Sequence, residues 1–186
     1  WQPVSNHLYN SNYPQNNSDV SRWYHQGGGS GRFDATHSCA TLPNANELSW
    51  YCMYGDPRWD ADESWTTMGH LYKGGMWFKK KANISGFNAN TAAYDGTDWR
   101  TTGNYRYYSL SQTLPSPADA GNYFYLPALG EYYSGQLSDV GYAGRYWSSS
   151  ANPGYIYGPY ILYYNSGNIM VYTDDRDYGN RVGGFE

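Results

Sequence analysis

The chain has 186 residues, which is enough for one domain with a sizeable core but cramped for two. Aromatic residues make up 19% of the chain and charged residues only 15%, and the formal net charge is −4. This negative balance gives nucleic-acid binding no electrostatic basis. No apolar run reaches membrane-spanning length and no signal peptide is recognisable, so we expect no membrane insertion. The first residue is Trp1 rather than Met, which suggests a mature or excised fragment.

The N-terminal part of the chain is expected to be irregular. We interpret 1–186 as a single ligand-binding domain in which residues 1–41 form an irregular N-terminal segment. Residues 1–36 are rich in Asn, Ser, Gly and Tyr, and Gly27–Gly29 forms a flexible break. Within this stretch, only Arg22–Tyr24 is expected to form a short strand.

The clearest predicted helix follows this segment. The sequence Asn44-Ala-Asn-Glu47 has the form of a capping box, in which the Asn side chain accepts from a free backbone N–H and the Glu side chain reaches back. Leu48, Tyr51 and Cys52 then share one face of the helix, and Gly55 marks its end.

The middle of the chain is predicted to contain two strands and two irregular stretches. Residues 56–66 (DPRWDADESWT) are acidic and aromatic and favour a solvated loop. Gly74–Lys80 begins with a glycine turn and continues as a strand. Phe87–Pro117 is long, polar and rich in Gly, Asn and Thr, which predicts a stretch draped over the surface. Asn122–Leu129 (NYFYLPAL) is apolar on both faces and indicates a buried strand.

Short strands are predicted at the C-terminal end. Gly144–Ser148 is one, and Tyr160–Tyr164 and Asn168–Tyr172 form a hairpin around a tight turn at Asn165-Ser-Gly167. Alternation divides the hairpin side chains between two faces. One face has Leu162, Tyr164, Ile169 and Val171, and the other has Ile161, Tyr163, Met170 and Tyr172. Both faces carry large residues, so one of them must be covered or must bind something.

The residues that could carry metal or covalent chemistry show no pattern typical of it. Cys39 and Cys52 are the only cysteines, and their spacing leaves a disulfide and two buried free thiols equally open. The four histidines show no ligand spacing, and the acidic run in 56–66 lacks the spaced oxygen ligands and glycine of an EF-hand loop. His37 and Cys39 could form a nucleophilic pair, but no orienting group or oxyanion donor stands nearby. We therefore expect no metal and no cofactor.

The most informative region is 142–178, which has nine of the 23 tyrosines. Tyr, Ser, Gly and Asn dominate antibody paratopes because Tyr offers a large rigid contact surface at low entropic cost. Here these residue types alternate with a frame of Trp147, Ser148–Ser150, Leu162 and further residues. The three serines lack a nucleophile elbow or a matching base, which favours local backbone hydrogen bonding over catalysis. The pattern is typical of a recognition surface.

Several strings in this region resemble the variable proteins of diversity-generating retroelements. They are GRYWSSSA at 144–151, PYILYYNSGN at 159–168 and VYTDDRDYG at 171–179. Residues 42–55, 69–81 and 123–150 also resemble the scaffold of such proteins from gut Bacteroidetes and their phages. The resemblance covers about Leu42 to Val182. It implies an α+β fold, C-type lectin-like and of the formylglycine-generating-enzyme type, which is loop-rich with short antiparallel strands and one or two helices.

In the family that the chain resembles, a reverse transcriptase randomises template adenines, so that AAC codons become hypervariable. The resemblance implies a hypervariable binding region at 142–182. The positions it implies are Asn152, Pro153, Gly154, Tyr155, Ile156, Tyr157, Ile161, Tyr163, Tyr172, Thr173, Asp174, Asp175, Asp177, Tyr178 and Asn180. Each of these residue types is reachable from AAC by changing its two adenines, whereas Met170, in a slot of the same kind, is not. The ending Arg181–Phe185 also departs from the Ser-Val-Arg-Pro sequence usual in the family.

These observations predict a non-enzymatic ligand-binding protein of the receptor-binding or adhesin type. Its partner would be a protein or glycan on a target cell, and its place a bacterial surface or a phage virion. One alternative is a metal-independent carbohydrate-binding module, because Tyr faces stack on sugars and the calcium-lectin strings are absent. A second alternative is an enzyme related to formylglycine-generating enzymes. Those use a C-terminal cysteine pair, and no cysteine follows Cys52 here. The ligand and the oligomeric state stay open.

Overall fold

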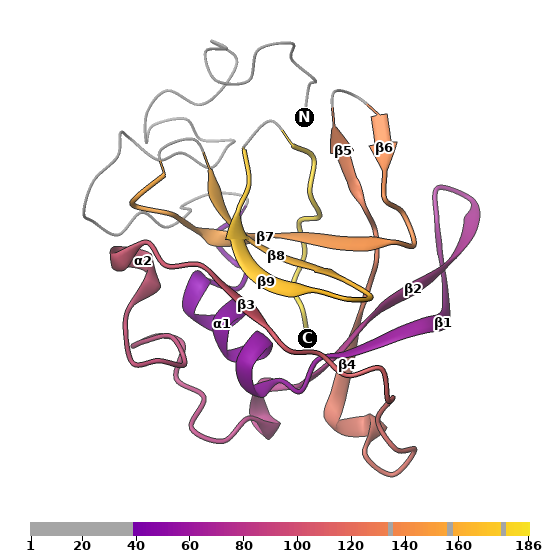
Figure 1. Cartoon of the computed structure of the whole chain (residues 1–186), viewed down its shortest axis with the longest axis horizontal. Helices are drawn as coiled ribbons and strands as arrows, with labels where there is room; N and C mark the ends of the chain where they lie inside the picture. The colour runs from indigo at the N-terminus through magenta and orange to yellow at the C-terminus, as the bar shows by residue number, and fades with distance from the viewer. Residues whose placement is uncertain (1–38, 134–135, 156–157, 176–177) are drawn as a thin grey trace.

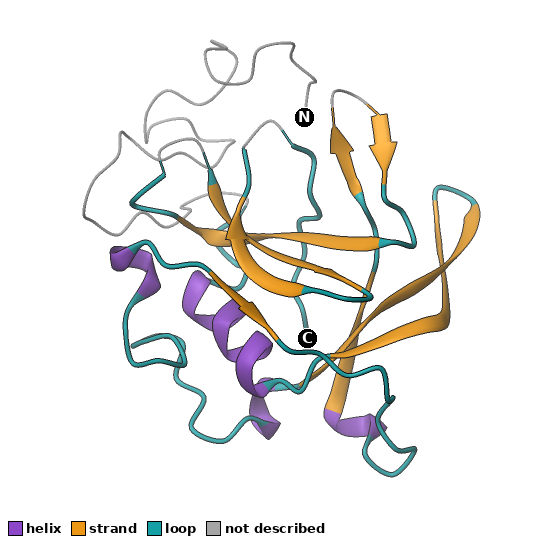
Figure 2. Ribbon diagram, viewed as in Figure 1, coloured by secondary structure: helices purple, strands orange, loops and turns teal. Residues whose placement is uncertain are grey.

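The computed structural model describes residues 39–133, 136–155, 158–175 and 178–186. In this part of the chain the protein is a mixed α+β structure of mostly antiparallel strands in small sheets with two α-helices (Figures 1 and 2). In chain order the elements are α1 (Ala45–Tyr54), β1 (Arg58–Thr67), β2 (His70–Lys79), η1 (Lys81–Asn83), α2 (Trp99–Thr102), β3 (Arg106–Tyr108), η2 (Ala120–Asn122), β4 (Tyr123–Pro127), β5 (Glu131–Tyr133), β6 (Gln136–Ser138), β7 (Ala143–Ala151), β8 (Pro159–Asn165) and β9 (Ile169–Thr173).

The described strands form three sheets, and neighbouring strands in each are antiparallel. The first has the order β1-β2-β4, the second β3-β9-β8-β7, and the third is the β5-β6 pair. In the second sheet, Arg106 of β3 is paired with Val171 of β9. The four-stranded sheet therefore brings the middle of the chain beside its C-terminal hairpin, as Figure 1 shows.

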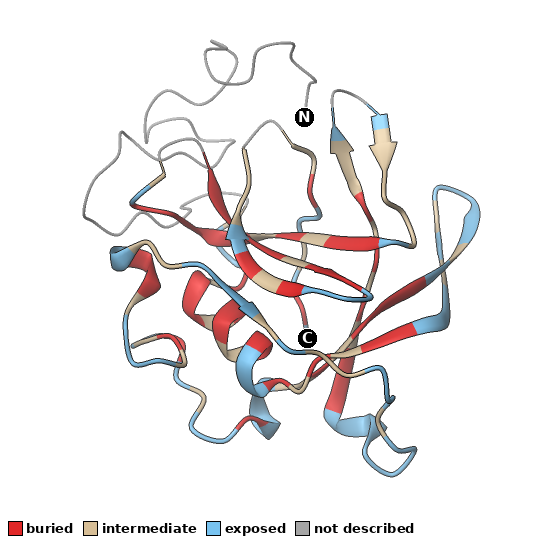
Figure 3. Cartoon of the chain, in the orientation of Figure 1, coloured by how far each residue is buried: buried red, intermediate tan, exposed pale blue. Residues whose placement is uncertain are grey.

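The hydrophobic core lies where α1 meets the two larger sheets (Figure 3). Tyr51 of α1 is fully buried and its ring contacts those of Phe78, Phe124 and Phe185. Its hydroxyl donates to the carboxylate of Glu186 at 2.5 Å, which satisfies the polar tip of this buried ring. The aromatic-rich composition is thus accommodated by packing rings from distant segments into one core.

The start of α1 confirms the Asn44 half of the predicted capping box, whereas the Glu47 side chain contacts Tyr51 instead of reaching back. The Asn44 side-chain oxygen accepts a hydrogen bond from the backbone N–H of Glu47 at 2.9 Å, and Leu48, Tyr51 and Cys52 are buried on one face. A Glu47 carboxylate oxygen lies 3.2 Å from the Tyr51 hydroxyl, so the Glu47 side chain runs along the helix. Such a cap satisfies one of the otherwise unpaired N–H groups of the first turn.

The prediction of a loop over residues 56–66 is wrong, because Arg58–Thr67 forms β1 and pairs with β2. Trp59 is buried, and the Asp60 carboxylate accepts hydrogen bonds from two backbone N–H groups and from the Trp77 indole at 3.0 Å. The register shifts between Asp60 and Ser64, which marks a bulge. The strand was missed because the bulge removes the alternation by which a half-buried strand is recognised.

The predicted surface stretch over Phe87–Pro117 is only partly correct. Trp99 in this stretch is fully buried and starts the short helix α2, and Arg106–Tyr108 is a strand. The Asp98 side chain accepts from the backbone N–H of Arg100 at 3.1 Å and caps α2. Burial of Trp99 and the cap formed by Asp98 therefore order part of a segment whose composition is typical of a loop.

The predicted strands of the C-terminal half are confirmed. Strand β4 corresponds to the apolar run at 122–129, and strand β7 contains 144–148. In the hairpin, Leu162 lies opposite Val171 and Tyr164 opposite Ile169, and all four are fully buried. The hairpin therefore has the two faces expected from alternation. The face with these four residues is fully covered, whereas the other face ranges from Ile161, which is 2% exposed, to Tyr172, which is 44% exposed.

Three further expectations concern the N-terminal segment, the cysteines and the membrane. The strand expected at Arg22–Tyr24 lies outside it. Cys52 is a free thiol that is 1% exposed, so the alternative of a Cys39–Cys52 disulfide is not realised in the structure. None of the described helices is long and apolar enough to cross a membrane.

Candidate ligand-binding site

Two of the predicted variable segments begin at the same end of the four-stranded sheet. Strand β7 ends at Ala151, opposite Pro159 at the start of β8. Strand β9 ends at Thr173, opposite Tyr160, which is also at the start of β8. The chain after β7 and the chain after β9 therefore leave the sheet side by side, although they are more than 20 residues apart in sequence.

These two segments line an open groove of about 780 Å³ together with the segment before and within β3. The lining residues are Gly103, Tyr105, Tyr107, Asn152, Gly154, Tyr155, Tyr172, Thr173, Asp174, Asp175 and Tyr178. Eight of these are predicted site residues, and a volume of this size is typical of ligand-binding pockets. The structure therefore gathers most of the described candidate positions into one concave surface.

Hydrogen bonds hold the two segments that are predicted to be variable in place. The Asn152 side-chain oxygen accepts from the backbone N–H of Gly154 at 2.8 Å and closes a turn after β7. The Tyr155 hydroxyl donates to the Asp175 carboxylate at 2.5 Å and joins this turn to the segment after β9. The backbone N–H of Asp174 donates to the carbonyl of Pro159 at 3.2 Å. Side chains at candidate positions thus join the turn after β7 to the segment after β9.

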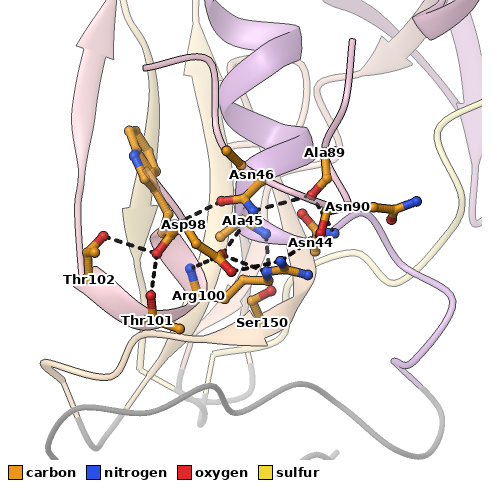
Figure 4. A network of polar contacts seen from close by, with 12 residues as sticks. Asn44, Ala45, Asn46, Ala89, Asn90, Asp98, Arg100, Thr101, Thr102 and Ser150 are labelled. Atoms are coloured by element: carbon orange, nitrogen blue, oxygen red, sulfur yellow. Dashed lines mark hydrogen bonds and ion pairs between the residues drawn. The ribbon is translucent and has the colours of Figure 1, made fainter. Parts of the chain in front are cut away.

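A polar network anchors the groove to the helix end (Figure 4). The Asn46 side chain donates to the Asp98 carboxylate at 3.0 Å and accepts from the backbone N–H of Trp99 at 2.9 Å. The guanidinium of Arg100, which is 3% exposed, donates to both Asp98 oxygens at 2.7 and 2.8 Å. The Ser150 hydroxyl accepts from the first N–H of α1 at 3.1 Å. The network therefore connects α1 to two sides of the groove. One side is the segment at Gly103, which follows α2, and the other is the turn at Asn152, which follows β7.

Gly103 allows the segment after α2 to lie close to the turn after β7. Its backbone has φ of 72°, a left-handed conformation that favours glycine. A Cβ atom added here would lie 3.0 Å from the Asn152 side-chain oxygen and 3.4 Å from the backbone nitrogen of Gly154. A larger residue would therefore push the segment after α2 away from the turn after β7.

Asp174 is a groove carboxylate whose ionisation is altered by burial. Burial, together with the negative charge of Glu131, raises the pKa of Asp174 to about 7, although Asn180 donates to its carboxylate at 2.9 Å. Arg145 lies behind this group and pairs with Glu131 at 3.2 Å and with Asp139 at 2.8 Å. Arg145 is thus shared between two carboxylates, and Asp174 changes its charge near neutral pH.

Not every predicted site residue lies on the groove. Ile161 is 2% exposed, between Trp147 and Tyr172 on the neighbouring strands, so the structure places it inside the sheet. Tyr163 packs under the guanidinium of Arg145, 5.0 Å from its ring centroid. Asn180 is 8% exposed and supports Asp174. Pro153 is buried, and Ile156, Tyr157 and Asp177 lie outside the described residues.

Sequence reasoning missed Gly103, Tyr105 and Tyr107, which form the third side of the groove. The Tyr105 and Tyr172 rings meet edge to face, with centroids 6.2 Å apart and planes at 90°. Tyr105 and Tyr107 are 59% and 63% exposed. The alternating sequence Tyr105-Arg-Tyr107-Tyr108 is a strand signal with tyrosines on one face, and it could have identified this wall within the polar stretch.

Ser148 and Cys52 are two described residues of types that can carry covalent catalysis, and both have structural surroundings. The Ser148 hydroxyl donates to the carbonyl of Ser150 at 3.0 Å and accepts from its N–H at 3.0 Å, which confirms the local hydrogen bonding expected for these serines. Burial raises the pKa of the Cys52 thiol well above its ordinary value, so the reactive thiolate is disfavoured. Among the described residues, no group of three or more His, Cys, Asp or Glu side chains is arranged to hold a metal ion.

A second, smaller hollow of about 260 Å³ lies beside the groove. It is lined by Thr67, Met68, Leu129, Gly130, Glu131, Tyr132, Leu137, Gly179, Asn180, Arg181 and Val182. Tyr132 exchanges both backbone hydrogen bonds with Gly179, so Glu131 and Asn180 are cross-strand neighbours. Asn180, which lines this hollow, also donates a hydrogen bond to the Asp174 carboxylate. The other residues that line the hollow are not among the predicted positions.

Comparison with known proteins provides no relative for this chain. No protein-family model matches it, and neither a curated protein nor a solved structure is significantly similar to it.

Proposed function

We propose that this protein is a non-enzymatic ligand-binding protein that uses the groove between β3, the end of β7 and the end of β9 as its combining site. In this proposal the chain is a variable protein of the kind found in diversity-generating retroelements, with a C-type-lectin-like fold. It would act at a bacterial surface or on a phage virion, where it contacts a protein or glycan of a target cell.

The observation that carries the proposal is that eight of the candidate positions line one groove, apart from the four fully buried residues of the hairpin. Along the hairpin, Leu162, Tyr164, Ile169 and Val171 are fully buried, whereas Tyr172 on the opposite face is 44% exposed and lines the groove. A site whose residues vary between siblings requires this separation, because a core residue cannot be exchanged freely.

The chemistry of the groove also supports recognition rather than catalysis. Five of its lining residues are tyrosines, which provide rigid contact area at low entropic cost. The enzyme class that the resemblance offers as an alternative uses a reactive cysteine pair. Cys52, the cysteine in the described core, is 1% exposed, and burial disfavours its thiolate. A metal-independent glycan site remains the second candidate, since exposed faces of Tyr105 and Tyr107 are suited to stacking on sugars.

The DNA that flanks the gene tests the proposed class. We expect a nearby repeat that matches the segment encoding 142–182 and differs from it at adenines, together with a reverse-transcriptase gene. Differences scattered over the codons of Leu162, Tyr164 and Val171 as often as over those of the groove residues would contradict the proposal.

Binding itself is tested on the purified chain. Fluorescently labelled protein is applied to a glycan array and to fixed cells of gut bacteria, alongside a variant in which Tyr155, Tyr172 and Tyr178 are replaced by Ser. We expect at least one bound target whose signal falls at least tenfold in the variant. A signal that is unchanged in the folded variant would place binding outside the groove.

A further inference from the structure

Strand β3 forms one edge of the four-stranded sheet. Among the described strands it pairs with β9 alone, and Figure 1 shows it beside β9 at the border of the sheet. Apart from this ladder, residues 104–110 form no backbone–backbone hydrogen bond with the described part of the chain. Residues 105–107 and 109 are exposed. An edge of this kind presents N–H and C=O groups that can pair with another extended segment.

The register shows which backbone groups face the open side. The N–H of Asp174, directly after β9, donates to the carbonyl of Pro159 on β8 at 3.2 Å. Backbone groups alternate in direction along a strand, so those of Val171, three residues earlier, face β3. Val171 lies opposite Arg106, whose own backbone groups therefore pair with β9. The N–H and C=O of the next residue, Tyr107, then point away from β9 to the open side.

Two exposed tyrosines lie along this edge. Tyr105 and Tyr107 are 59% and 63% exposed, and both line the groove. The Tyr105 ring contacts that of Tyr172, and Tyr107, two residues further along the chain, is on the same face of the sheet. Arg106 is on the other face, where its guanidinium lies over the Tyr94 ring, 5.8 Å from the centroid. The open edge is thus continuous with the groove, and the side chains that it presents there are aromatic.

We propose that an extended segment of a protein ligand pairs with the open edge of β3 and packs its side chains against Tyr105 and Tyr107 in the groove. This inference rests on the proposed function and names the ligand class of the same site. An extended polypeptide matches the edge because every second residue turns its N–H and C=O toward the same side. A glycan lacks this repeat of backbone donors and acceptors, so its binding would depend on the tyrosine rings.

A second copy of this chain is a less suitable occupant of the edge. Short strands and charged residues are common devices that protect an edge against pairing between copies. Strand β3 has three residues and includes Arg106. A ligand segment adds to these few hydrogen bonds the contact area of the groove, in which Tyr105, Tyr107 and Tyr172 lie next to the edge. Tyrosine rings provide such contact area at low entropic cost.

Amide hydrogen exchange measured by NMR tests whether the edge is open in the free protein. We expect the Tyr107 N–H to exchange at least tenfold faster than the N–H of Arg106, which pairs with β9. Slow exchange of the Tyr107 N–H would show that another part of the chain or a second copy already occupies the edge. That result would overturn the inference.

Binding is tested with dodecapeptides selected from a random library displayed on phage, and affinities are measured by isothermal titration calorimetry. Tyr107→Ala removes the ring and keeps the N–H, whereas Tyr107→Pro removes both, a change that an edge strand tolerates where the N–H faces outward. We expect a selected peptide to bind Tyr107→Pro at least fivefold more weakly than Tyr107→Ala, because loss of the N–H leaves a peptide carbonyl unpaired. A library without any binder that distinguishes the two variants would overturn the inference.

Ester replacement in the peptide gives a measurement that does not depend on the folding of Tyr107→Pro. Replacing one peptide bond by an ester removes one N–H from the probe. We expect the affinity for the unmodified protein to fall at least fivefold where the lost N–H faces β3 and less than twofold at the next position, so that the losses alternate along the peptide. Losses without this alternation would contradict pairing with the edge.

Two further outcomes separate this inference from the proposed function. If a target found on cells or on the glycan array is lost when the groove tyrosines are replaced, but binds Tyr107→Pro as well as Tyr107→Ala, this inference fails while the proposed function stands. If none of these variants alters any binding, both fail. A dimer of the free protein that Tyr107→Pro dissociates, measured by analytical ultracentrifugation, would assign the edge to a second copy and would also overturn the inference.

Discussion

The same substitution at two positions of the C-terminal hairpin should have very different effects on stability. Tyr164 and Tyr172 lie on the two faces of this hairpin, and Tyr164 is fully buried while Tyr172 is 44% exposed. Replacing each in turn by Ser tests whether one face is the folding core and the other a surface that tolerates change. The comparison is matched in chemistry, since both variants lose a phenol ring and gain a hydroxyl.

The expected cost of Tyr164→Ser follows from its contacts. Its ring packs against those of Phe78 and Tyr146, and its hydroxyl donates to the carbonyls of Leu126 at 2.7 Å and Pro127 at 3.0 Å. Truncating a large buried aromatic costs about 3–5 kcal/mol. For a protein of this length each kcal/mol lowers the melting temperature by about 2–4 °C, so we expect a decrease of about 6–20 °C.

The expected cost of Tyr172→Ser is much smaller. An exposed substitution changes stability by about 0.5 kcal/mol. Loss of the ring contact with Tyr105 adds about another 0.5 kcal/mol, the lower end for aromatic pairs, because both rings are exposed to water. The sum of about 1 kcal/mol corresponds to a decrease of about 2–4 °C.

Differential scanning calorimetry of the three proteins at pH 7.5 measures both shifts. Tyr164→Phe serves as a control that keeps the ring and removes only the hydroxyl, and it should lie between the two Ser variants. The reasoning is refuted if Tyr172→Ser lowers the melting temperature as much as Tyr164→Ser does. The groove face of the hairpin would then be part of the core, and it could not serve as an exchangeable binding surface.

Three further predictions concern the scaffold. Asp98→Ala should lower the free energy of unfolding by about 3–5 kcal/mol in urea titrations, because it leaves the buried Arg100 guanidinium without its carboxylate. Burial opposes ionisation of Asp98, but hydrogen bonds from Arg100 and Asn46 outweigh it and hold the pKa of Asp98 below its ordinary value. The stability from this group should therefore be complete above about pH 4 and be lost on acidification through the lower folded pKa, a loss that Asp98→Ala should not show. The Cys52 thiol should resist alkylation in the native protein and react after denaturation, as mapped by mass spectrometry; rapid native labelling would contradict its burial. Treatment with a chelator should shift the melting temperature by less than about 1 °C, because the Asp60 oxygens are occupied by protein donors. A drop of several degrees would reveal a metal site.

The features that could be predicted from the sequence are those determined by neighbouring residues. The cap of α1 depends on Asn44 and the N–H group three residues later. The hairpin depends on alternation across a short turn, which places Leu162 opposite Val171 without reference to the rest of the chain. Strand β1 was missed because its pairing with β2 stabilises a sequence with a bulge and an exposed acidic edge, and no local pattern records that pairing.

The groove proposed as the combining site shows the same division between local and distant information. Tyr155, Tyr172 and Asp175 could be predicted because they lie in segments whose composition and alternation indicate a surface. Tyr105 belongs to the same groove only because β3 pairs with β9, a contact between segments more than 60 residues apart. The side of the groove that contains Tyr105 lies outside 142–182, the region in which variation is expected. Under the proposed function, a constant tyrosine beside variable positions would give every related protein the same aromatic anchor, and the variable residues would then select among ligands that this anchor accepts.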